Sequence, residues 1–319
     1  MTRGDITPAR RPRRRAGAGT SRGRTTSTST RTDWWALVMI APATIGLAVL
    51  YLWPLGSTLS KSFMEVPAFG PGEFTGLDNY TELLGDDAFW GAFRNSALYA
   101  VIVVGLGIPL AIVLASLIEQ VSRGRTLYRV LFFLPVVTLP VAVGMVWRLI
   151  LNGDFGVFNW LLSLVGIQGR YWVADERFTI YAFAAVGIWM GLGINLIILG
   201  AGLRGIPPAL YEASSLDGAG RVRQFFSITL PLLTPTIFFT VVISTIAAMQ
   251  MFDLVFVMLG SINNTALDGS RTIVYLFYES AFVHFRQGYA AAIAVVLLLL
   301  IIGATAIQFR LQKRWVSYD

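Results

Sequence analysis

The chain has 319 residues, of which 55% are hydrophobic and only 13% are charged. Soluble domains carry about 25% charged residues, so this composition excludes an ordinary soluble globular protein. The formal net charge of +7 raises the possibility of nucleic-acid binding, while the lack of cysteine excludes disulfides and thiol chemistry.

Residues 1–33 form a polar tail rich in Arg, Gly, Ser and Thr, with the run RRPRRR at 10–15. A segment with so few apolar residues cannot bury enough surface to fold, so we expect a disordered basic tail. The apolar run that follows is about twice as long as the hydrophobic core of a signal peptide. We therefore expect it to stay in the membrane as a first span.

Six windows free of charged residues follow in chain order. A helix that crosses a bilayer needs about 20 mostly apolar residues, which each window supplies or nearly supplies. They predict an all-α integral membrane protein whose transmembrane domain fills residues 34–319. We place the six transmembrane helices at about residues 35–60, 95–118, 130–150, 178–203, 226–252 and 287–309. The connection 151–178 is apolar enough to predict a short interfacial helix.

The basic residues are distributed unevenly among the connections. Of the 25 Lys and Arg residues, eighteen lie in the two termini and in the second and fourth connections, and seven lie in the others. The positive-inside rule then places both termini in the cytoplasm. This asymmetry favours the basic tail as a topology anchor near anionic lipid and argues against a nucleic-acid-binding arm.

The residues that carry catalysis or ion coupling are scarce. The two lysines, Lys61 and Lys313, lie outside any GxxxxGK[ST] pattern, so the chain has no P-loop for ATP. His284 is the only histidine, and we expect no metal site, no bound cofactor and no enzymatic activity. An ion-coupled secondary transporter acting alone needs ionisable residues inside its spans. The nearest are Asp253 and Glu279, at or beyond span ends, so this alternative is less favoured, as is a membrane enzyme or scaffold.

The fourth connection, residues 204–225, interrupts the apolar sequence with charges and glycines. Pro207–Pro208 suits the start of a short helix ALYEASSL, with Glu212 near its N-terminal end. Gly218 and Gly220 permit a left-handed or sharp exit. Its five charged residues would together cost about 12–17 kcal/mol at mid-bilayer, so we expect the loop at the cytoplasmic face, within reach of a partner.

The stretch EASSLDGAGRVRQFFSITLPLL resembles the EAA loop of binding-protein-dependent ABC importer permeases. That pattern is E-A-A, three residues, Gly, nine residues, Ile, one residue and Leu-Pro. It falls here on Glu212, Ala213, Ser214, Gly218, Ile228, Leu230 and Pro231. Ser214 replaces the third alanine, and the family's frequent Gly-Gly-Pro turn is replaced by GSINNTALDGSRT. The stretches GLDNYTELL, RVLFFLP, MQMFD and GYAAAIAVVL add to a resemblance to carbohydrate permeases of the maltose and glycerol-3-phosphate type.

The resemblance implies a type I ABC importer permease fold in a prokaryotic inner (cytoplasmic) membrane. It implies a second permease subunit as heterodimer partner and an extracytoplasmic solute-binding protein that delivers the sugar. It further implies a separate cytosolic ATPase dimer, which uses ATP and Mg and drives the rocking of the spans through the fourth connection.

Roles within this loop follow from the resemblance. Glu212 is expected to anchor the ATPase, with Ala213, Ser214 and Leu216 as the packing face. Asp217 is expected to order the turn, and Gly218 to let the backbone reverse under close approach. The alternative is that Gly218 and the prolines only shape a loop.

Small or polar residues on the fourth and fifth spans are candidates for the sugar path. They are Trp189, Gly191, Asn195, Thr245, Gln250 and Asp253. Asn195 and Gln250 have interhelical hydrogen bonding as their alternative role, and Trp189 has simple packing. The sequence does not choose among a monosaccharide, a disaccharide and glycerol-3-phosphate.

Overall fold

The structure is a computed structural model that describes residues 34–67, 72–121, 124–260 and 264–315. The basic tail at 1–33, predicted to be disordered, lies outside these residues. The chain divides into two units, residues 1–51 and 52–319. In the first, α1 (Trp34–Leu47) continues into the π-helical turn η1 (Ala48–Leu52) and presents exposed apolar side chains such as Met39 and Leu50.

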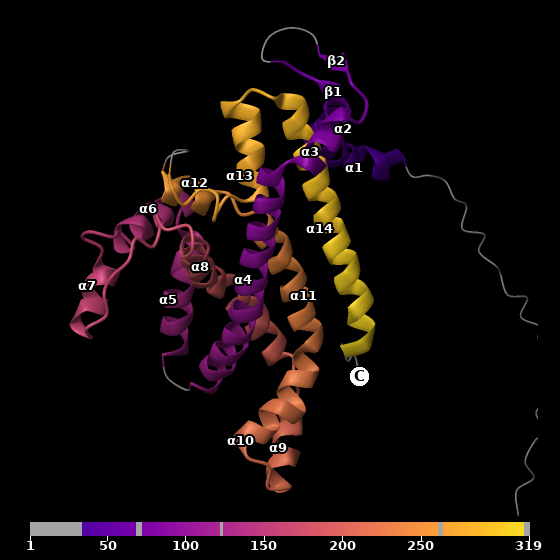
Figure 1. Cartoon of the computed structure of the whole chain (residues 1–319). Coiled ribbons are helices and arrows are strands. Elements are labelled where there is room, and N and C mark those ends of the chain that lie inside the picture. The colour runs from indigo at the N-terminus through magenta and orange to yellow at the C-terminus, as the bar shows by residue number, and fades with distance from the viewer. Residues whose placement is uncertain (1–33, 68–71, 122–123, 261–263, 316–319) are drawn as a thin grey trace, which may run out of the picture. The chain divides into compact units, whose positions relative to one another are not determined.

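In the described residues of the second unit, the regular elements are helices apart from one small β-hairpin (Figure 1). The hairpin pairs β1 (Met64–Glu65) antiparallel with β2 (Glu73–Phe74). The helices before the fourth connection are α2 (Trp53–Lys61), α3 (Asp78–Gly85), α4 (Asp87–Gln120), α5 (Arg125–Val137), α6 (Pro140–Ile150), α7 (Val157–Leu164) and α8 (Thr179–Arg204). The later ones are α9 (Pro208–Leu216), α10 (Arg221–Gln224), η2 (Phe225–Thr229), α11 (Leu230–Met249), α12 (Asp253–Leu259), α13 (Ile273–Tyr278), η3 (Glu279–Val283) and α14 (Gln287–Trp315).

Five of the six predicted spans correspond to helices long and apolar enough to cross a membrane. These helices are Trp35–Lys61, Asp87–Gln120, Thr179–Arg204, Arg221–Met249 and Gln287–Lys313. The helix Asp87–Gln120 begins earlier than the predicted second span, 95–118. The helix Arg221–Met249 ends before the predicted end of the fifth span at residue 252. The short helix predicted between the third and fourth spans is α7.

The third predicted span, 130–150, is not one straight helix. It consists of α5 and α6, which meet at an angle of 99°. Thr138 and Leu139 between them have extended ψ angles of 149° and 127°. Pro140 explains the break, because its ring disfavours a helical residue before it and it has no N–H to donate into a continuing helix. The apolar window concealed this bend.

The core of the second unit has two parts. The larger joins α4 and α8 to α12, α13 and α14, and the smaller lies where α4, α8 and α11 pack together, with α5 against α8. Small residues let the backbones approach closely, as is usual between membrane helices. A Cβ at Gly193 on α8 would lie 2.5 Å from the Phe132 carbonyl oxygen of α5. Away from these contacts the helices expose apolar side chains such as Leu106, Val113 and Phe239, which suits contact with lipid.

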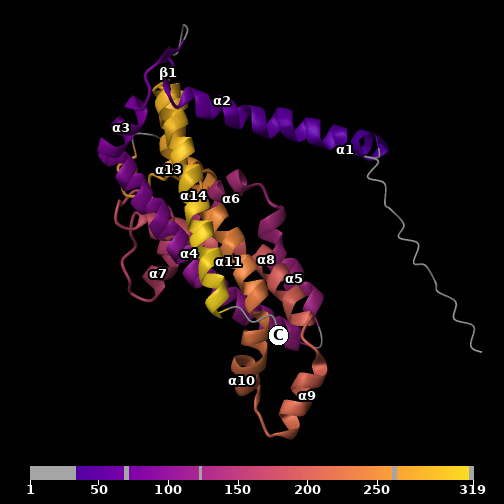
Figure 2. The ribbon, with the colours of Figure 1, turned by 90° about the vertical axis from the view of Figure 1, so that its right-hand side faces the viewer.

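The second unit has two polar ends. The views in Figures 1 and 2 agree that α9 and α10 lie at one end, and that the hairpin and α3 lie at the opposite one. We call them the α9 end and the hairpin end.

Candidate functional site

The α9 end is built from the fourth connection. Pro207, with an extended ψ of 127°, precedes Pro208 in the first turn of α9, as the sequence predicts. The helix ends in a Schellman motif, because the Ala219 N–H donates to the Ser214 carbonyl at 3.0 Å and the Gly218 N–H donates to that of Ser215 at 3.1 Å. Gly218 has a φ of +78°, the left-handed conformation that favours glycine.

Most side chains of the predicted ATPase-coupling set point away from the chain. Leu216 is 90% exposed, although apolar, and Glu212, Ala213 and Asp217 are also exposed, while Ser214 is half-buried. A helix that offers leucine and alanine to its surroundings has a face without a partner in the described chain. This arrangement fits a docking element.

Two details differ from the sequence expectations. Glu212 is the fifth residue of α9, beyond the first turn, so the helix N-terminus contributes little to its environment. The turn after α9 is closed by backbone hydrogen bonds, and within the described residues the Asp217 carboxylate accepts no hydrogen bond. At Gly218, no atom of the described chain lies within 4 Å of an added Cβ. Within this subunit, the left-handed φ is therefore the feature that favours glycine at this position.

The rest of the pattern lies where the chain enters α11. Ile228 is half-buried in the π-helical turn η2, and Leu230 and Pro231 are the first two residues of α11. Proline is tolerated there because an N–H in the first turn needs no intrahelical partner. Single π-helical turns inside α-helices are frequent at functional sites.

Four residues absent from the sequence prediction tie this loop together. The Gln224 amide donates to the Ser215 hydroxyl oxygen at 2.9 Å and to the Tyr211 carbonyl oxygen at 3.2 Å. The hydroxyls of Tyr211 and Thr229 share a hydrogen bond of 2.9 Å. We call Tyr211, Ser215, Gln224 and Thr229 the α9 clip. In the sequence, these residues are polar side chains next to the apolar start of the fifth span. Such a pattern is too common to predict a specific hydrogen-bonded cluster.

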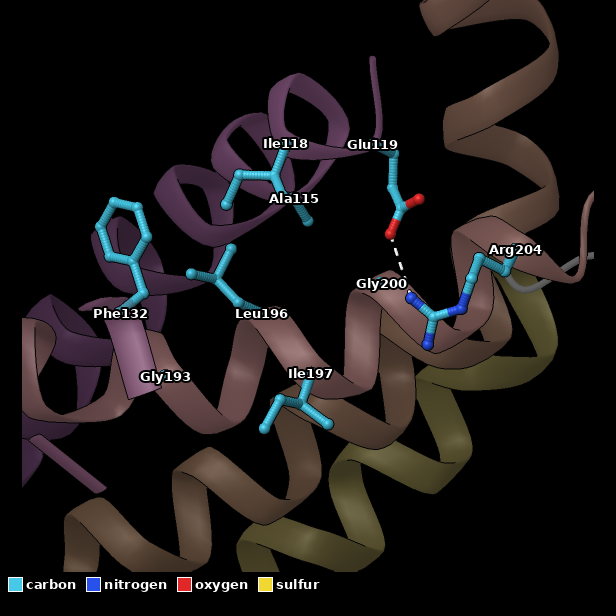
Figure 3. A pocket seen from close by; sticks show the side chains of 9 residues that line it. All are labelled: Ala115, Ile118, Glu119, Phe132, Gly193, Leu196, Ile197, Gly200 and Arg204. Atoms are coloured by element: carbon cyan, nitrogen blue, oxygen red, sulfur yellow. Dashed lines mark hydrogen bonds and ion pairs between the residues drawn. The ribbon is translucent and has the colours of Figure 1, made fainter. Parts of the chain in front are cut away.

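A second polar contact joins the nearby ends of α4 and α8. Arg204 donates from Nη1 to Glu119 Oε1 at 3.0 Å (Figure 3). The pair borders a cavity of about 210 Å³. Phe132, Leu196 and Ile197 supply its apolar part. Arg204 also lies in the last turn of α8, where a cation is favourable.

The structure does not bring the six sugar-path candidates into one site. Asn195 is buried and its Oδ1 accepts a hydrogen bond from Ser244 of α11 at 3.3 Å. Thr245 accepts one from Gln308 of α14 at 2.8 Å. Trp189 packs edge-on against Trp147 with ring centroids 5.6 Å apart. Asn195, Thr245 and Trp189 therefore all have packing or interhelical contacts.

The remaining three candidates are more open. Gly191 is half-buried, and Gln250 and Asp253 are exposed, the first directly after α11 and the second at the start of α12. A role in the sugar path stays a prediction for all six.

The hairpin end holds the buried carboxylate of Glu279, only 6% exposed. Burial raises the pKa of this carboxyl above its ordinary value of 4.5, while Arg271, whose Nε lies 2.9 Å from Oε2, opposes the rise. Asn95 of α4 donates to the carbonyl oxygens of Asp268 and Arg271 at 2.9 and 3.1 Å. Among the described residues, no group of three or more His, Cys, Asp or Glu side chains could hold a metal ion. These contacts are those of a structural network.

Comparison with known proteins places this geometry in context. The model of the family described as binding-protein-dependent transport system inner membrane component matches residues 74–317. The probable ABC transporter permease protein YesP of Bacillus subtilis is 35% identical over 283 residues, 88% of this chain and 91% of that protein. The sn-glycerol-3-phosphate transport system permease protein UgpA of Agrobacterium fabrum is 31% identical over 88% of this chain and 95% of its own.

Solved structures share the fold. A chain of a bacterial ABC transporter involved in the import of the acidic polysaccharide alginate superposes with a TM-score of 0.76 at 26% identity, over 88% of this chain and 96% of that chain. A bacterial alginate ABC transporter in complex with an alginate pentasaccharide-bound periplasmic protein gives a TM-score of 0.77 at 23% identity, over 89% and 95%. The residues matched by the family model, 74–317, include the α9 end.

Proposed function

The chain belongs to the family of inner membrane components of binding-protein-dependent transport systems, and for this ABC importer permease we propose a sugar or a related carbohydrate as cargo. The cargo class is supported by the relatives, which include sn-glycerol-3-phosphate permeases and a transporter of the polysaccharide alginate. The protein is a multi-pass membrane protein, and we propose six spans with the bent pair α5 and α6 as the third.

Both termini and the α9 end are proposed to be cytoplasmic, on the basis of the distribution of Lys and Arg. The hairpin end then faces outward, where an extracytoplasmic solute-binding protein would deliver cargo. A second permease subunit is proposed to complete the translocation path.

The observation that carries this proposal is the exposed face of α9. Leu216 is 90% exposed at the end of a helix held in a defined turn by the Schellman motif. An isolated exposed leucine is common, but here it lies beside exposed Ala213 and Glu212 in a matched family pattern. We propose that this face docks on a separate ATPase dimer, which binds ATP and Mg and drives the movement of the spans.

The proposal is tested by purifying the chain from its native membrane in mild detergent and identifying the proteins that accompany it. An ATPase subunit and a second permease are expected, and the solute retained by an accompanying binding protein identifies the cargo. Proteoliposomes containing the complex should transport that solute only when Mg-ATP is present on the side of the membrane that carries the ATPase. A chain that purifies alone and transports along an ion gradient would instead be a secondary transporter.

A further inference from the structure

A second cavity lies at the α9 end, next to the one in Figure 3, and Glu119 lines both. Its volume is about 380 Å³. Small-molecule sites measure about 300–1,000 Å³, so this cavity is large enough for a small organic ligand. Its wall combines the ends of α4 and α8 with the segment that contains α9, α10 and η2. The cavity therefore forms only in the folded subunit.

Most of the wall is polar. It includes a carboxylate, a guanidinium, an amide and hydroxyl groups, from Glu119, Arg221, Gln224, Ser116, Tyr211 and Thr229. Leu203 and Phe225 add apolar surface. A few convergent polar groups beside apolar and aromatic side chains are typical of a small-molecule site.

Several of these polar groups keep hydrogen-bonding capacity that the chain does not use. The Gln224 amide nitrogen donates within the α9 clip, whereas among the described residues nothing donates to its side-chain oxygen. Ser116 donates its hydroxyl proton to the Ile112 carbonyl at 2.8 Å, so its oxygen remains an acceptor. The Arg221 guanidinium makes no hydrogen bond or ion pair with any residue that the structure describes. The cavity thus offers both a donor and acceptors to a ligand.

Acceptors predominate in the wall, and this favours a ligand that can donate hydrogen bonds. Glu119 is a carboxylate, which accepts only, and it is held by Arg204 at 3.0 Å. A phosphate dianion would pair with Arg221 but would bring no O–H to the oxygens of Ser116 and Gln224. A hydroxyl group both donates and accepts. A neutral molecule with several hydroxyls therefore matches both kinds of group.

The aromatic part of the wall fits the same class of ligand. A sugar ring carries C–H groups on its faces and hydroxyls around its edge, so Phe225 can pack against a face while the polar groups bind the edge. The residues of the proposed ATPase-docking face, Glu212, Ala213 and Leu216, do not line the cavity. A ligand in the cavity and a docked ATPase thus use different side chains.

From these groups we propose that the cavity binds a neutral carbohydrate at the cytoplasmic face of the subunit. Arg221 is the hydrogen-bond donor to the hydroxyls of the ligand, and Ser116 and Gln224 are acceptors. The site is separate from the six candidates for the sugar path, because none of them lines it. The cytoplasmic location rests on the proposed function, whereas binding itself is measured on the full chain alone.

The lack of cysteine in the chain permits a site-specific test. Gln120 lines the cavity, is exposed and has no side-chain hydrogen bond to a described residue, so Gln120→Cys introduces one thiol there. The purified full-length chain in lipid nanodiscs is labelled with a water-soluble maleimide in the presence of glucose, maltose or glucose 6-phosphate. At about ten times its dissociation constant, glucose or maltose should slow labelling about tenfold. Ser227→Cys, exposed in η2 and outside the cavity wall, is the control whose labelling should not change.

Arg221→Gln, combined with Gln120→Cys, tests the assigned donor. Loss of a hydrogen bond from a charged group should raise the sugar concentration needed for half-maximal protection about tenfold. Arg223→Gln is the matched control, because Arg223 carries the same charge in the same helix, is exposed and does not line the cavity. It should leave the protection unchanged.

Two results would overturn the proposal. The first is labelling of the Gln120→Cys variant that neither glucose nor maltose slows. The second is stronger protection by glucose 6-phosphate than by glucose, which would make the cavity an anion site. A wild-type complex that contains no ATPase would instead refute the proposed function, and the protection measured on the chain alone does not depend on that outcome.

Discussion

The two polar ends of the second unit are held together to very different degrees. At the hairpin end, side chains connect segments far apart in sequence. Asn95 binds the 268–271 loop, Tyr289 donates to Asp86, and Thr265 donates to the Ala174 carbonyl. At the α9 end, the hydrogen bonds of α9 reach only its own loop and η2, and large apolar side chains such as Leu216, Val222 and Phe226 are exposed.

We interpret the hairpin end as a rigid frame and the α9 end as a mobile part of the subunit. Many long-range contacts raise the free energy needed for local opening, whereas a segment with few buried contacts moves at little cost. We therefore expect substitutions at the hairpin end to change stability, and substitutions at the α9 end to change coupling. The predictions below test that separation, from the largest effect to the smallest.

The largest effect is expected at Gly218. In Gly218→Asp, membrane insertion and protein level should remain normal, while uptake should fall at least about tenfold. A side chain then enters the docking face. The residue must also keep a left-handed φ, which costs about 1–2 kcal/mol when the residue is not glycine. Uptake of labelled cargo and immunoblotting of membranes measure the two quantities.

Gly220→Asp is the matched control. Gly220 is also exposed, has no atom within 4 Å of an added Cβ and has a φ of −72°, which any residue adopts. Uptake should be largely retained. Equal loss in both variants would mean that charge in the loop, not the left-handed turn, causes the defect.

At the hairpin end, Asn95→Ala should destabilise the protein by about 1–3 kcal/mol, because it removes a buried donor and leaves the part-buried carbonyl oxygens of Asp268 and Arg271 without it. Thermal unfolding in detergent measures the loss. Uptake per ATP hydrolysed should match the wild type in the protein that remains folded. A normal unfolding temperature with impaired coupling would remove the distinction between frame and moving part.

Glu279 predicts a pH dependence of stability. Because burial raises its pKa in the folded state, the folded protein binds more protons than the unfolded chain at pH values above 4.5. Its contribution to stability is therefore fully present below pH 4.5 and is lost as the pH rises through the folded pKa. Glu279→Gln, which cannot ionise, should lack this loss. Parallel unfolding curves of the two proteins across that pH range would contradict it.

The smallest effect is expected for the exposed ion pair between Arg286 and Glu82. Each side chain is about half exposed, and pairs of this kind contribute about 0–1 kcal/mol. Arg286→Gln should shift the unfolding temperature by no more than a few degrees and leave uptake unchanged. A large shift would assign this pair to the structural frame of the hairpin end.

Several features of the protein were determined by the sequence alone. The apolar windows specify the membrane class and five helices, because lipid requires about 20 apolar residues per crossing. Pro207–Pro208 and Gly218 specify where α9 begins and ends, because the constraints on φ and on the N–H lie within the residues themselves. The spacing from Glu212 to Pro231 identifies the family.

Other features were decided only by the tertiary structure. The 99° bend between α5 and α6 is hidden in a uniformly apolar window, although Pro140 marks its position. The partners of Asn195 and Thr245 depend on how α8, α11 and α14 are rotated against one another. The α9 clip likewise needs η2 to bring Thr229 to Tyr211. Such pairs depend on the packing of whole helices, which local backbone preferences do not encode, and so the partners appear only when the helices are assembled.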